Sequence, residues 1–350
     1  MLHMIKIPHH KDDYECMWNG IEDLYIQKTG EKIPPHFFFS LASFGSFCYM
    51  KTEKSDLKRL VALGDGRTKQ MFDFLAPIVG FEYKFHVYKT VENAIKKARR
   101  EIDNGYPVIL GALDMFYLPY YEKIYYTEHI PFHYVLMIGY DDEKEKITIL
   151  DCGREEPQEL PYNELRAAWN CSYSGVSKPF TLCTIRMANV KSKEQIAKES
   201  LKKKANMFLH PPVGFIGYKG FEKFIMELPT WKKQLGIENY NKQLFNMVQF
   251  YGTVPTIPNA LRGISEPDEI VFGGGFDKIS CVLSELSEEY KNDYYKAAAE
   301  TFNCGVAVVE EIKKIIVEYL TNINDETNKL PSLYTQLKNI MIEGFSKLEY

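Results

Sequence analysis

Three side chains in this sequence are of the types that carry out nucleophilic catalysis: the thiol of Cys16, the imidazole of His133 and the carboxylate of Asp151. A carboxylate that accepts a hydrogen bond from one imidazole nitrogen fixes the tautomer of the ring and leaves the other nitrogen to act as a base. A thiol close to that base can react as a thiolate. Together the three residue types predict a triad of nucleophile, base and orienting group.

His133 and Asp151 lie at the outer ends of a predicted β-hairpin. The runs HYVLMIGY and ITILD are apolar, and DDEKEK between them supplies a polar turn. With a turn centred near Asp142, strand pairing brings residue 133 close to residue 151. Alternation with a period of two puts His133 and Val135 on one face of their strand, and Ile149 and Asp151 on one face of the other. We therefore expect His133 and Asp151 to meet on the same face of the sheet.

Cys16 lies in a segment whose apolar spacing predicts a helix over residues 12–30, which ends at Gly30. The apolar stripe of this helix includes Ile21 and Leu24, and Cys16 lies off it, in the first turn. The positive end of a helix dipole lowers the pKa of a thiol at that position, and a neighbouring imidazolium does the same. Cys16 is therefore the best candidate for the nucleophile.

Each of these residues also has a structural interpretation. A single cysteine at the start of a helix is usually a small buried apolar residue. A lone histidine in a strand is more often hydrogen-bonded within the sheet than catalytic, and Asp151 is typical of a turn at the end of a strand. The joint pattern is rarer than its parts, which favours the catalytic interpretation.

The remaining sequence predicts an α+β domain over residues 1–190, followed by a mostly helical domain over residues 191–350. In the first domain we expect strands at YKFHVYK, PVILGAL and PFTLCTIRM, and helices near residues 68–78, at TVENAIKKARREIDNG and at LPYNELRAAW. The segment IPPHFFFSLASFGSFCYM, which lies between the predicted helices at 12–30 and 68–78, is predicted to be rich in loops. In the second domain we expect a long helical tract from about residue 276 to 320.

Composition excludes several classes of protein. A formal net charge of −4 argues against a general nucleic-acid binder. No stretch approaches the ~18 apolar residues of a membrane span, and the N-terminus has no signal-peptide core. Seven cysteines without metal-ligand spacing indicate free thiols in a reducing cytoplasm and no metal site. We also expect no tightly bound cofactor.

The order cysteine, histidine, aspartate is that of papain-like and C39-peptidase-like cysteine enzymes. In addition, the segments YEC, NGIEDLYIQKTGEKI, NGYPVILGALDMFYLPYY, HYVLMIGYDD and ITILD resemble the N-terminal domain of the butirosin-biosynthesis acyltransferase family. GFEKFIMELPTW and GGGFDKISCVLSELSEEY resemble, more loosely, the helical domain that follows it in many members. The resemblance is most specific over residues 105–151 and implies a papain-like fold.

What the resemblance implies is acyl transfer in antibiotic biosynthesis. An acyl carrier protein would present an aminoacyl group as a phosphopantetheine thioester, and a small-molecule amine would accept it. Cys16 would be the nucleophile, His133 the base and Asp151 its orienting group, while Asp114 and Tyr120 match a strand-and-loop motif that could line the cleft. Where family members often carry a histidine before the cysteine, this chain has Glu15, and an adjacent carboxylate opposes ionisation of the thiol.

The backbone N–H of Cys16 is the obvious first donor of an oxyanion hole, and Tyr14 and His10 lie a few residues upstream. His10, however, belongs to an HH pair that is equally typical of a solvated turn. Lys202, Lys203 and Lys204 could meet an acidic carrier protein, although charge runs usually form a solvated helix face.

Two alternatives to an acyltransferase remain open. A cysteine peptidase or amide hydrolase would use the same triad with water as the acceptor. A binding protein would keep the fold without a working site. The helical domain would cap the cleft or form a homodimer.

Overall fold

A computed structural model describes residues 2–12, 20–53, 57–65, 67–172, 178–251, 256–268 and 273–349. The chain forms two compact units. The first contains residues 1–33 and 66–196, and the second contains residues 34–65 and 197–350. The second unit thus includes residues 34–65, which the sequence predicts to belong to the first domain.

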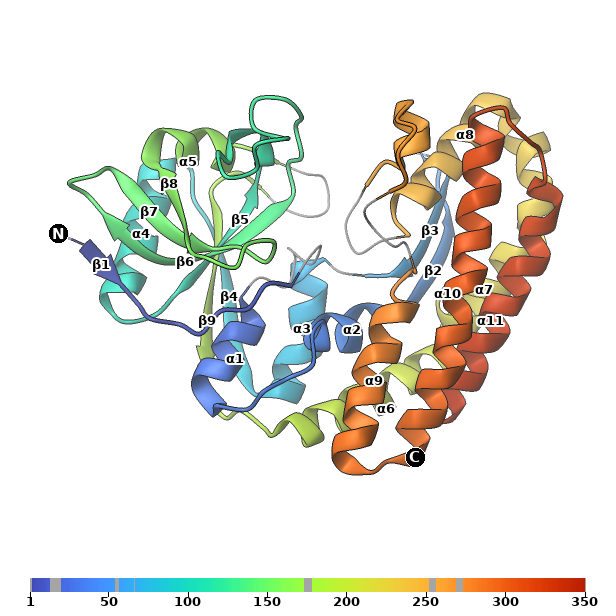
Figure 1. Cartoon of the computed structure of the whole chain (residues 1–350), viewed down its shortest axis with the longest axis horizontal. Coiled ribbons are helices and arrows are strands. Elements are labelled where there is room, and N and C mark those ends of the chain that lie inside the picture. Colours follow the sequence, from blue (N-terminus) through green and yellow to red (C-terminus); the bar gives the residue numbers. More distant parts are fainter. Residues whose placement is uncertain are drawn as a thin grey trace. The chain divides into compact units, whose positions relative to one another are not determined.

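The first unit is built on one seven-stranded sheet in which every paired strand is antiparallel (Figure 1). The strand order is β4-β9-β5-β6-β7-β8, and β1 also pairs with β6. The bounds are β1 Leu2–Met4, β4 Phe81–Val87, β5 Val108–Leu113, β6 His133–Asp141, β7 Lys146–Leu150, β8 Gln158–Pro161 and β9 Thr181–Met187. The predicted α+β fold is confirmed.

The helices of this unit are α1 (Ile21–Thr29), α3 (Thr68–Val79), α4 (Val91–Asp103) and α5 (Tyr162–Trp169), with a short 3-10 turn, η1, at Met115–Tyr117. Thr90 caps α4 by accepting a hydrogen bond from the backbone N–H of Asn93. Three of the four helices match the predicted ones closely. They do so because each has an apolar face of helical period next to a clear stop signal.

The predicted helix over residues 12–30 is confirmed only in its second half. Gly20 has a φ of 70° and a ψ of 0°, so the right-handed helix of α1 begins only at Ile21. Its predicted end is confirmed, because Gly30 takes the left-handed conformation and its N–H donates to the carbonyl of Ile26. Residues 13–19 lie outside the described part of the chain.

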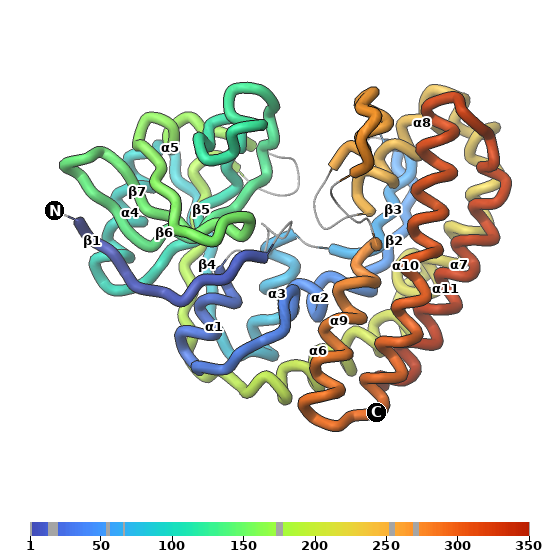
Figure 2. Tube along the Cα trace, viewed as in Figure 1, coloured from blue at the N-terminus to red at the C-terminus, as the bar shows by residue number. Residues whose placement is uncertain are grey.

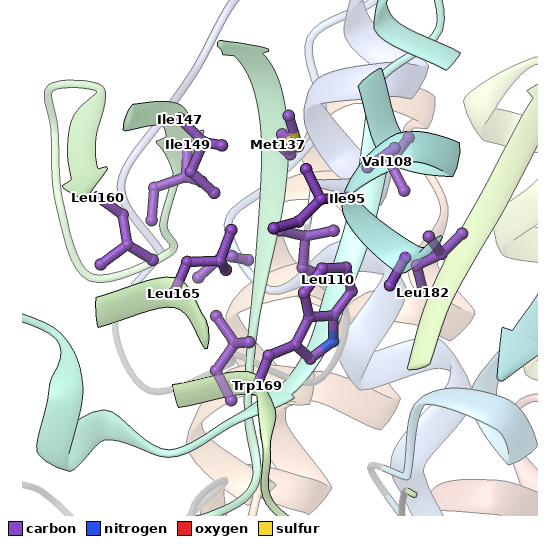
Figure 3. Packing of buried hydrophobic residues seen from close by; sticks show 14 of the residues in the cluster. Ile95, Val108, Leu110, Met137, Ile147, Ile149, Leu160, Leu165, Trp169 and Leu182 are labelled. Atoms are coloured by element: carbon purple, nitrogen blue, oxygen red, sulfur yellow. The ribbon is translucent and has the colours of Figure 1, made fainter. Parts of the chain in front are cut away.

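The core of the first unit lies between the sheet and the helices α4 and α5. Ile95 of α4, Trp169 of α5 and Leu110 of β5 are among its members, as Figure 3 shows. Trp169 is fully buried, and its indole N–H donates to the carbonyl of Thr181 at 2.8 Å. The prediction that this tryptophan packs on the sheet is therefore confirmed.

In the second unit, residues 34–65 form structure that the sequence interpretation missed. The aromatic run folds into α2 (Phe37–Ser43) and β2 (Phe44–Lys51), and β2 pairs with β3 (Arg59–Gly64). Phe47 stacks on Phe221 of α7 at a ring separation of 4.0 Å. The expected loop is thus a helix and a hairpin, because its aromatic side chains bury against helices far along the chain.

The helices of the second unit are α7 (Gly217–Glu227), α8 (Trp231–Gln249), α9 (Phe276–Tyr290), α10 (Asp293–Leu320) and α11 (Leu330–Ser346), while α6 (Lys193–Leu209) crosses the unit boundary. Figure 2 shows β2 and β3, in blue, beside α7 and α8. The expected single tract over 276–320 is two helices. Lys291 is left-handed, and the Asn292 side chain caps α10 by accepting from the N–H groups of Tyr294 and Tyr295.

Candidate active site

His133 and Asp151 meet, as predicted, where β6 begins and just after β7 ends. The Nε2 atom of His133 lies 2.6 Å from Oδ2 of Asp151, and their side chains are 3% and 0% exposed. Burial excludes water from the contact, which strengthens the electrostatic part of the hydrogen bond. The second nitrogen, Nδ1, lies on the other side of the ring from this bond.

A β-bulge in β6 decides that the two side chains share a face. The turn covers residues 142–145, and beyond it Gly139 pairs with Thr148 while Met137 pairs with Ile149. Ile138 is therefore an extra residue on β6. Extending the ladder puts Asp151 opposite Val135, diagonal to His133 and on its face. Without the extra residue Asp151 would lie opposite Leu136, on the other face of the sheet.

The turn is therefore not centred near Asp142, and residues 133 and 151 are diagonal neighbours and not a direct pair. The predicted contact between their side chains is confirmed. The core also reflects the bulge. Met137 and Tyr140 both belong to the core cluster although they are three residues apart, which breaks the period of two.

Two tyrosines complete the surroundings of Asp151. Tyr120 donates its hydroxyl to Oδ2 at 2.8 Å, and Tyr121 donates to Oδ1 at 2.9 Å. The backbone N–H of Gly153 donates to Oδ1 at 3.3 Å. The ring of Tyr121 also meets His133 edge to face, with centroids 5.5 Å apart. The carboxylate is thus held by donors on both oxygens.

These contacts keep Asp151 ionised. Burial by itself raises the pKa of a carboxyl group, but the positive charge of His133 and the hydrogen bonds from His133, Tyr120 and Tyr121 outweigh it, so the pKa of Asp151 is lowered. Burial and the charge of Asp151 raise the pKa of Tyr120 well above its usual value, so this hydroxyl stays a donor. An ionised Asp151 favours the imidazolium form of His133.

The side chain of Arg154 contacts both tyrosines. Its guanidinium lies 4.4 Å from the ring centroid of Tyr121 and donates to the backbone carbonyl of Tyr120 at 2.6 Å. Its backbone N–H donates to the carbonyl of Asp151 at 3.0 Å. Arg154 therefore links the loop that carries the tyrosines to the end of β7.

Cys16 and Tyr14 lie outside the described residues, so their predicted roles stay predictions. The residues on either side of them are described. The backbone N–H of Asp12 donates to the carbonyl of Cys152 at 2.8 Å, one residue after Asp151. Gly20 packs so closely on β6 that a Cβ at this position would lie 2.5 Å from Cδ2 of Leu136.

Asp114, the other predicted cleft residue, has the contacts of a loop-closing residue. Its Oδ2 lies 2.6 Å from Nδ1 of His129, and its Oδ1 accepts from the backbone N–H groups of Phe116 and Ile130. These bonds close the loop that follows β5. Of the predicted cleft residues Asp114 and Tyr120, only Tyr120 contacts the histidine–aspartate pair in the described chain. A substrate-binding role for either residue stays a prediction.

Several described cysteines are poor candidates for a reactive thiolate. Burial raises the pKa of Cys171 to about 12, with a further contribution from Asp114, and burial raises the pKa of Cys183 to about 12. Burial and Glu285 also raise the pKa of Cys281. Because the thiolate is the nucleophile, none of these three thiols is suited to attack an acyl group near neutral pH.

The HH pair is not a solvated turn. His9 and His10 contact the buried carboxylates of Glu22 and Asp23 on α1. His10, Asp12 and Glu22 have ligand atoms within 4.8 Å of one another, which is metal-binding spacing. Both nitrogens of His10, however, are already bonded to carboxylates, which leaves none of them for an ion.

Sequence reasoning missed Tyr121, Arg154, His9 and the acidic pair of α1. Tyr121 follows directly on the predicted Tyr120. For the acidic pair, the signal was two adjacent charges next to apolar Ile21 and Leu24 on a short helix, matched in number by two adjacent histidines upstream. Neither pair alone predicts burial.

Fold and site together define the class: an α+β domain whose antiparallel sheet buries a histidine–aspartate pair at one end. Comparison with known domains gives two matches. Residues 15–152 match the family described as Butirosin biosynthesis protein H, N-terminal, and residues 164–254 match a domain of unknown function, DUF4872. The chain therefore carries the butirosin biosynthesis protein H N-terminal domain followed by this second domain, which confirms the resemblance seen in the sequence.

The match of its N-terminal domain suggests a role related to butirosin biosynthesis. No curated protein matches the chain. Among the described residues, no helix combines the length and apolar character needed to cross a bilayer.

Proposed function

We propose that this protein is a cysteine-dependent acyltransferase in which Cys16 carries the acyl group, His133 moves the proton and Asp151 orients and charges the imidazole. The observation that carries the proposal is the buried His133–Asp151 contact of 2.6 Å, which lies in the domain that matches Butirosin biosynthesis protein H, N-terminal. An ionised carboxylate costs free energy to bury unless a partner compensates its charge. In a catalytic triad the imidazole of the base is that partner.

The residues that flank Cys16 support its role. Residue 12 is bonded to Cys152, beside Asp151, and residue 20 packs on Leu136 of β6. Cys16 is four residues from each anchor, and four residues span at most about 14 Å when fully extended. Both ends of the segment that carries the thiol are therefore held at the strands that carry the pair.

The reaction has two steps. Cys16 gives its proton to His133, its sulfur attacks the carbonyl carbon of a pantetheine thioester, the carbon–sulfur bond of the donor breaks, and the pantetheine thiolate takes the proton from His133. An amine then attacks the acyl-enzyme, His133 accepts the amine proton, and the Cys16 thiolate leaves. An acyl carrier protein would supply the donor, because one thioester then replaces another. A small-molecule amine would accept the acyl group, because an amide is more stable than a thioester.

Intact-mass spectrometry after incubation with an aminoacyl-pantetheine thioester tests the proposal. We expect wild type to gain the mass of one acyl group and Cys16→Ala to gain none. Cys304→Ala is the matched control, because Cys304 is an exposed thiol in the other unit, and it should be acylated like wild type. Asp151→Asn should acylate about 100-fold more slowly or worse, since the base loses its charged partner.

Acceptors distinguish the remaining alternatives. If an added amine consumes the acyl-enzyme faster than water does, the protein transfers; if water alone clears it, the protein is a hydrolase. Absence of any adduct on wild type would leave only the binding-protein interpretation.

A further inference from the structure

A second cluster of ionisable groups lies in the first unit, on both sides of the segment that carries Cys16. His9 and His10 precede that segment, and Glu22 and Asp23 follow it. The side chains of His9 and Asp23 are 7% and 1% exposed, and Glu22 is fully buried. We name these four residues the double-histidine clamp.

The bonds in the clamp pair one residue before the segment with one after it. Nδ1 of His9 lies 2.5 Å from Oδ2 of Asp23, and Nδ1 of His10 lies 2.9 Å from Oδ1 of the same carboxylate. Nε2 of His10 lies 2.8 Å from Oε2 of Glu22. The clamp therefore holds residues 9 and 10 beside residues 22 and 23, on either side of the segment that contains Cys16.

The partners determine the charge of both rings. Nε2 of His9 lies 2.8 Å from the carbonyl oxygen of Arg154, and a carbonyl only accepts, so this nitrogen carries a proton. Its other nitrogen faces a carboxylate, as do both nitrogens of His10. Two imidazolium groups thus offset two buried carboxylates. In agreement, burial lowers the pKa of His10 but its bonds to Asp23 and Glu22 raise it to about 10, and the pKa of His9 is raised by Asp23.

His9 joins the clamp to the histidine–aspartate pair. The carbonyl that it contacts belongs to Arg154, whose side chain stacks on Tyr121 and bonds to the backbone of Tyr120. Both tyrosines donate to Asp151. A continuous series of polar contacts therefore runs from α1 to Asp151.

We propose that the double-histidine clamp is a positioning device for the active site: it joins the two chain segments that flank Cys16 and ties them, through Arg154, to the residues that hold His133. This inference rests on the proposed function, because it assigns a role to the surroundings of the proposed nucleophile. His9 and Asp23 are positioning residues, since neither contacts His133 or Asp151 directly. A charge-balanced buried cluster suits this role. Any arrangement that separates its members leaves a buried charge uncompensated, which costs free energy, so the paired arrangement is strongly preferred.

The test is the pH dependence of alkylation of Cys16 by iodoacetamide, followed by peptide mass spectrometry. The rate reports the thiolate fraction, and therefore the apparent pKa of the thiol. If the clamp holds Cys16 near His133, His9→Gln and Asp23→Asn should raise that apparent pKa by one unit or more, towards the value of about 8.5 for a free cysteine. They should also lower kcat for acylation about tenfold or more with little change in KM.

His3→Gln is the matched control. His3 pairs with Asp103 at 2.9 Å in the same unit, but this pair is exposed and contacts none of the clamp residues in the described chain. Its loss should leave the apparent pKa and the acylation rate of Cys16 unchanged. Circular dichroism of each variant establishes that it folds.

Two further variants keep the inference testable if His9→Gln fails to fold. His10→Gln removes a more exposed member of the clamp, and Arg154→Met removes the contacts to the tyrosines while it keeps the carbonyl that His9 binds. Each should shift the apparent pKa of Cys16 in the same direction. Folded variants with the wild-type alkylation profile would overturn the clamp, whereas failure of wild type to accept an acyl group would overturn the proposed function alone, because alkylation needs no turnover.

Discussion

At the scale of single residues, the site depends on how each buried charge is offset. Asp151 receives hydrogen bonds from His133, Tyr120 and Tyr121, and these lower its pKa despite complete burial. His10 gains two carboxylate partners, which raise its pKa to about 10. In both cases a buried or half-buried charged group is stable only because its neighbours have the opposite charge or donate hydrogen bonds to it.

The raised pKa of His10 predicts a pH dependence of stability. An imidazole with a folded pKa of about 10 and an unfolded pKa near 6.5 stabilises the fold fully below pH 6.5, and loses this contribution as the pH rises towards 10. His10→Gln should therefore lower the free energy of unfolding most at pH 6, on the order of 1–3 kcal/mol because the ring is partly exposed, and least near pH 10.

Urea unfolding of wild type and His10→Gln at pH 6, 8 and 9.5 measures this difference. Since other groups also titrate over this range, only the difference between the two proteins is diagnostic. His3→Gln again serves as the control and should cost less stability at pH 6 than His10→Gln, because its ion pair with Asp103 is solvent-exposed. An equal loss of stability at every pH would contradict the assignment of His10 as an imidazolium.

At the scale of elements, two local irregularities place the site. The bulge at Ile138 puts Asp151 on the face of His133, and the left-handed Gly20 ends the approach to α1 against Leu136. Both are features that a smooth strand or helix would not have. Bulges and left-handed glycines recur next to functional sites because they redirect a chain without adding residues elsewhere.

Gly20 and Gly30 offer a matched test of this packing. They bracket α1 with nearly equal φ angles of 70° and 73°, but a Cβ on Gly20 would overlap Leu136, whereas a Cβ on Gly30 would meet nothing within 4 Å. Gly30→Ala should cost about 1 kcal/mol from the strained backbone alone. Gly20→Ala should cost about 2–4 kcal/mol, because overpacking adds to that strain.

The free energies of unfolding of the two variants, taken from denaturant titrations, give the comparison. The difference between them isolates the contact of residue 20 with β6. Equal costs would mean that Gly20 does not pack on Leu136, which would remove one of the two anchors of the Cys16 segment.

At the scale of the whole molecule, the division of the chain does not follow the order of the sequence. Residues 34–65 belong to the second unit, where Phe44 packs on Phe276, Phe302 and Phe345. Lys204, from the run expected to meet a carrier protein, is buried there and donates to the hydroxyl of Ser46, and burial lowers its pKa to about 7. Lys202 and Lys203 are exposed.

A fragment of residues 1–190 should therefore expose the aromatic side chains of residues 34–65. We expect it to bind a hydrophobic dye such as ANS strongly and to be cut by protease within this segment, while the full chain is protected there. Limited proteolysis with mass spectrometry measures both proteins under the same conditions. A fragment that resists cleavage between residues 34 and 65 would show that these residues fold without the helices.

Local features of the protein could be predicted from the amino-acid sequence: the hairpin that bears His133 and Asp151, the helix α4, and the glycine that ends α1. Each follows from the period of side-chain directions and from backbone preferences, which act over a few neighbouring residues. The partners of residues 34–65, and the joining of His9 and His10 to the acidic pair of α1, became known only from the folded chain. Those contacts depend on which surfaces meet, and no local period carries that information.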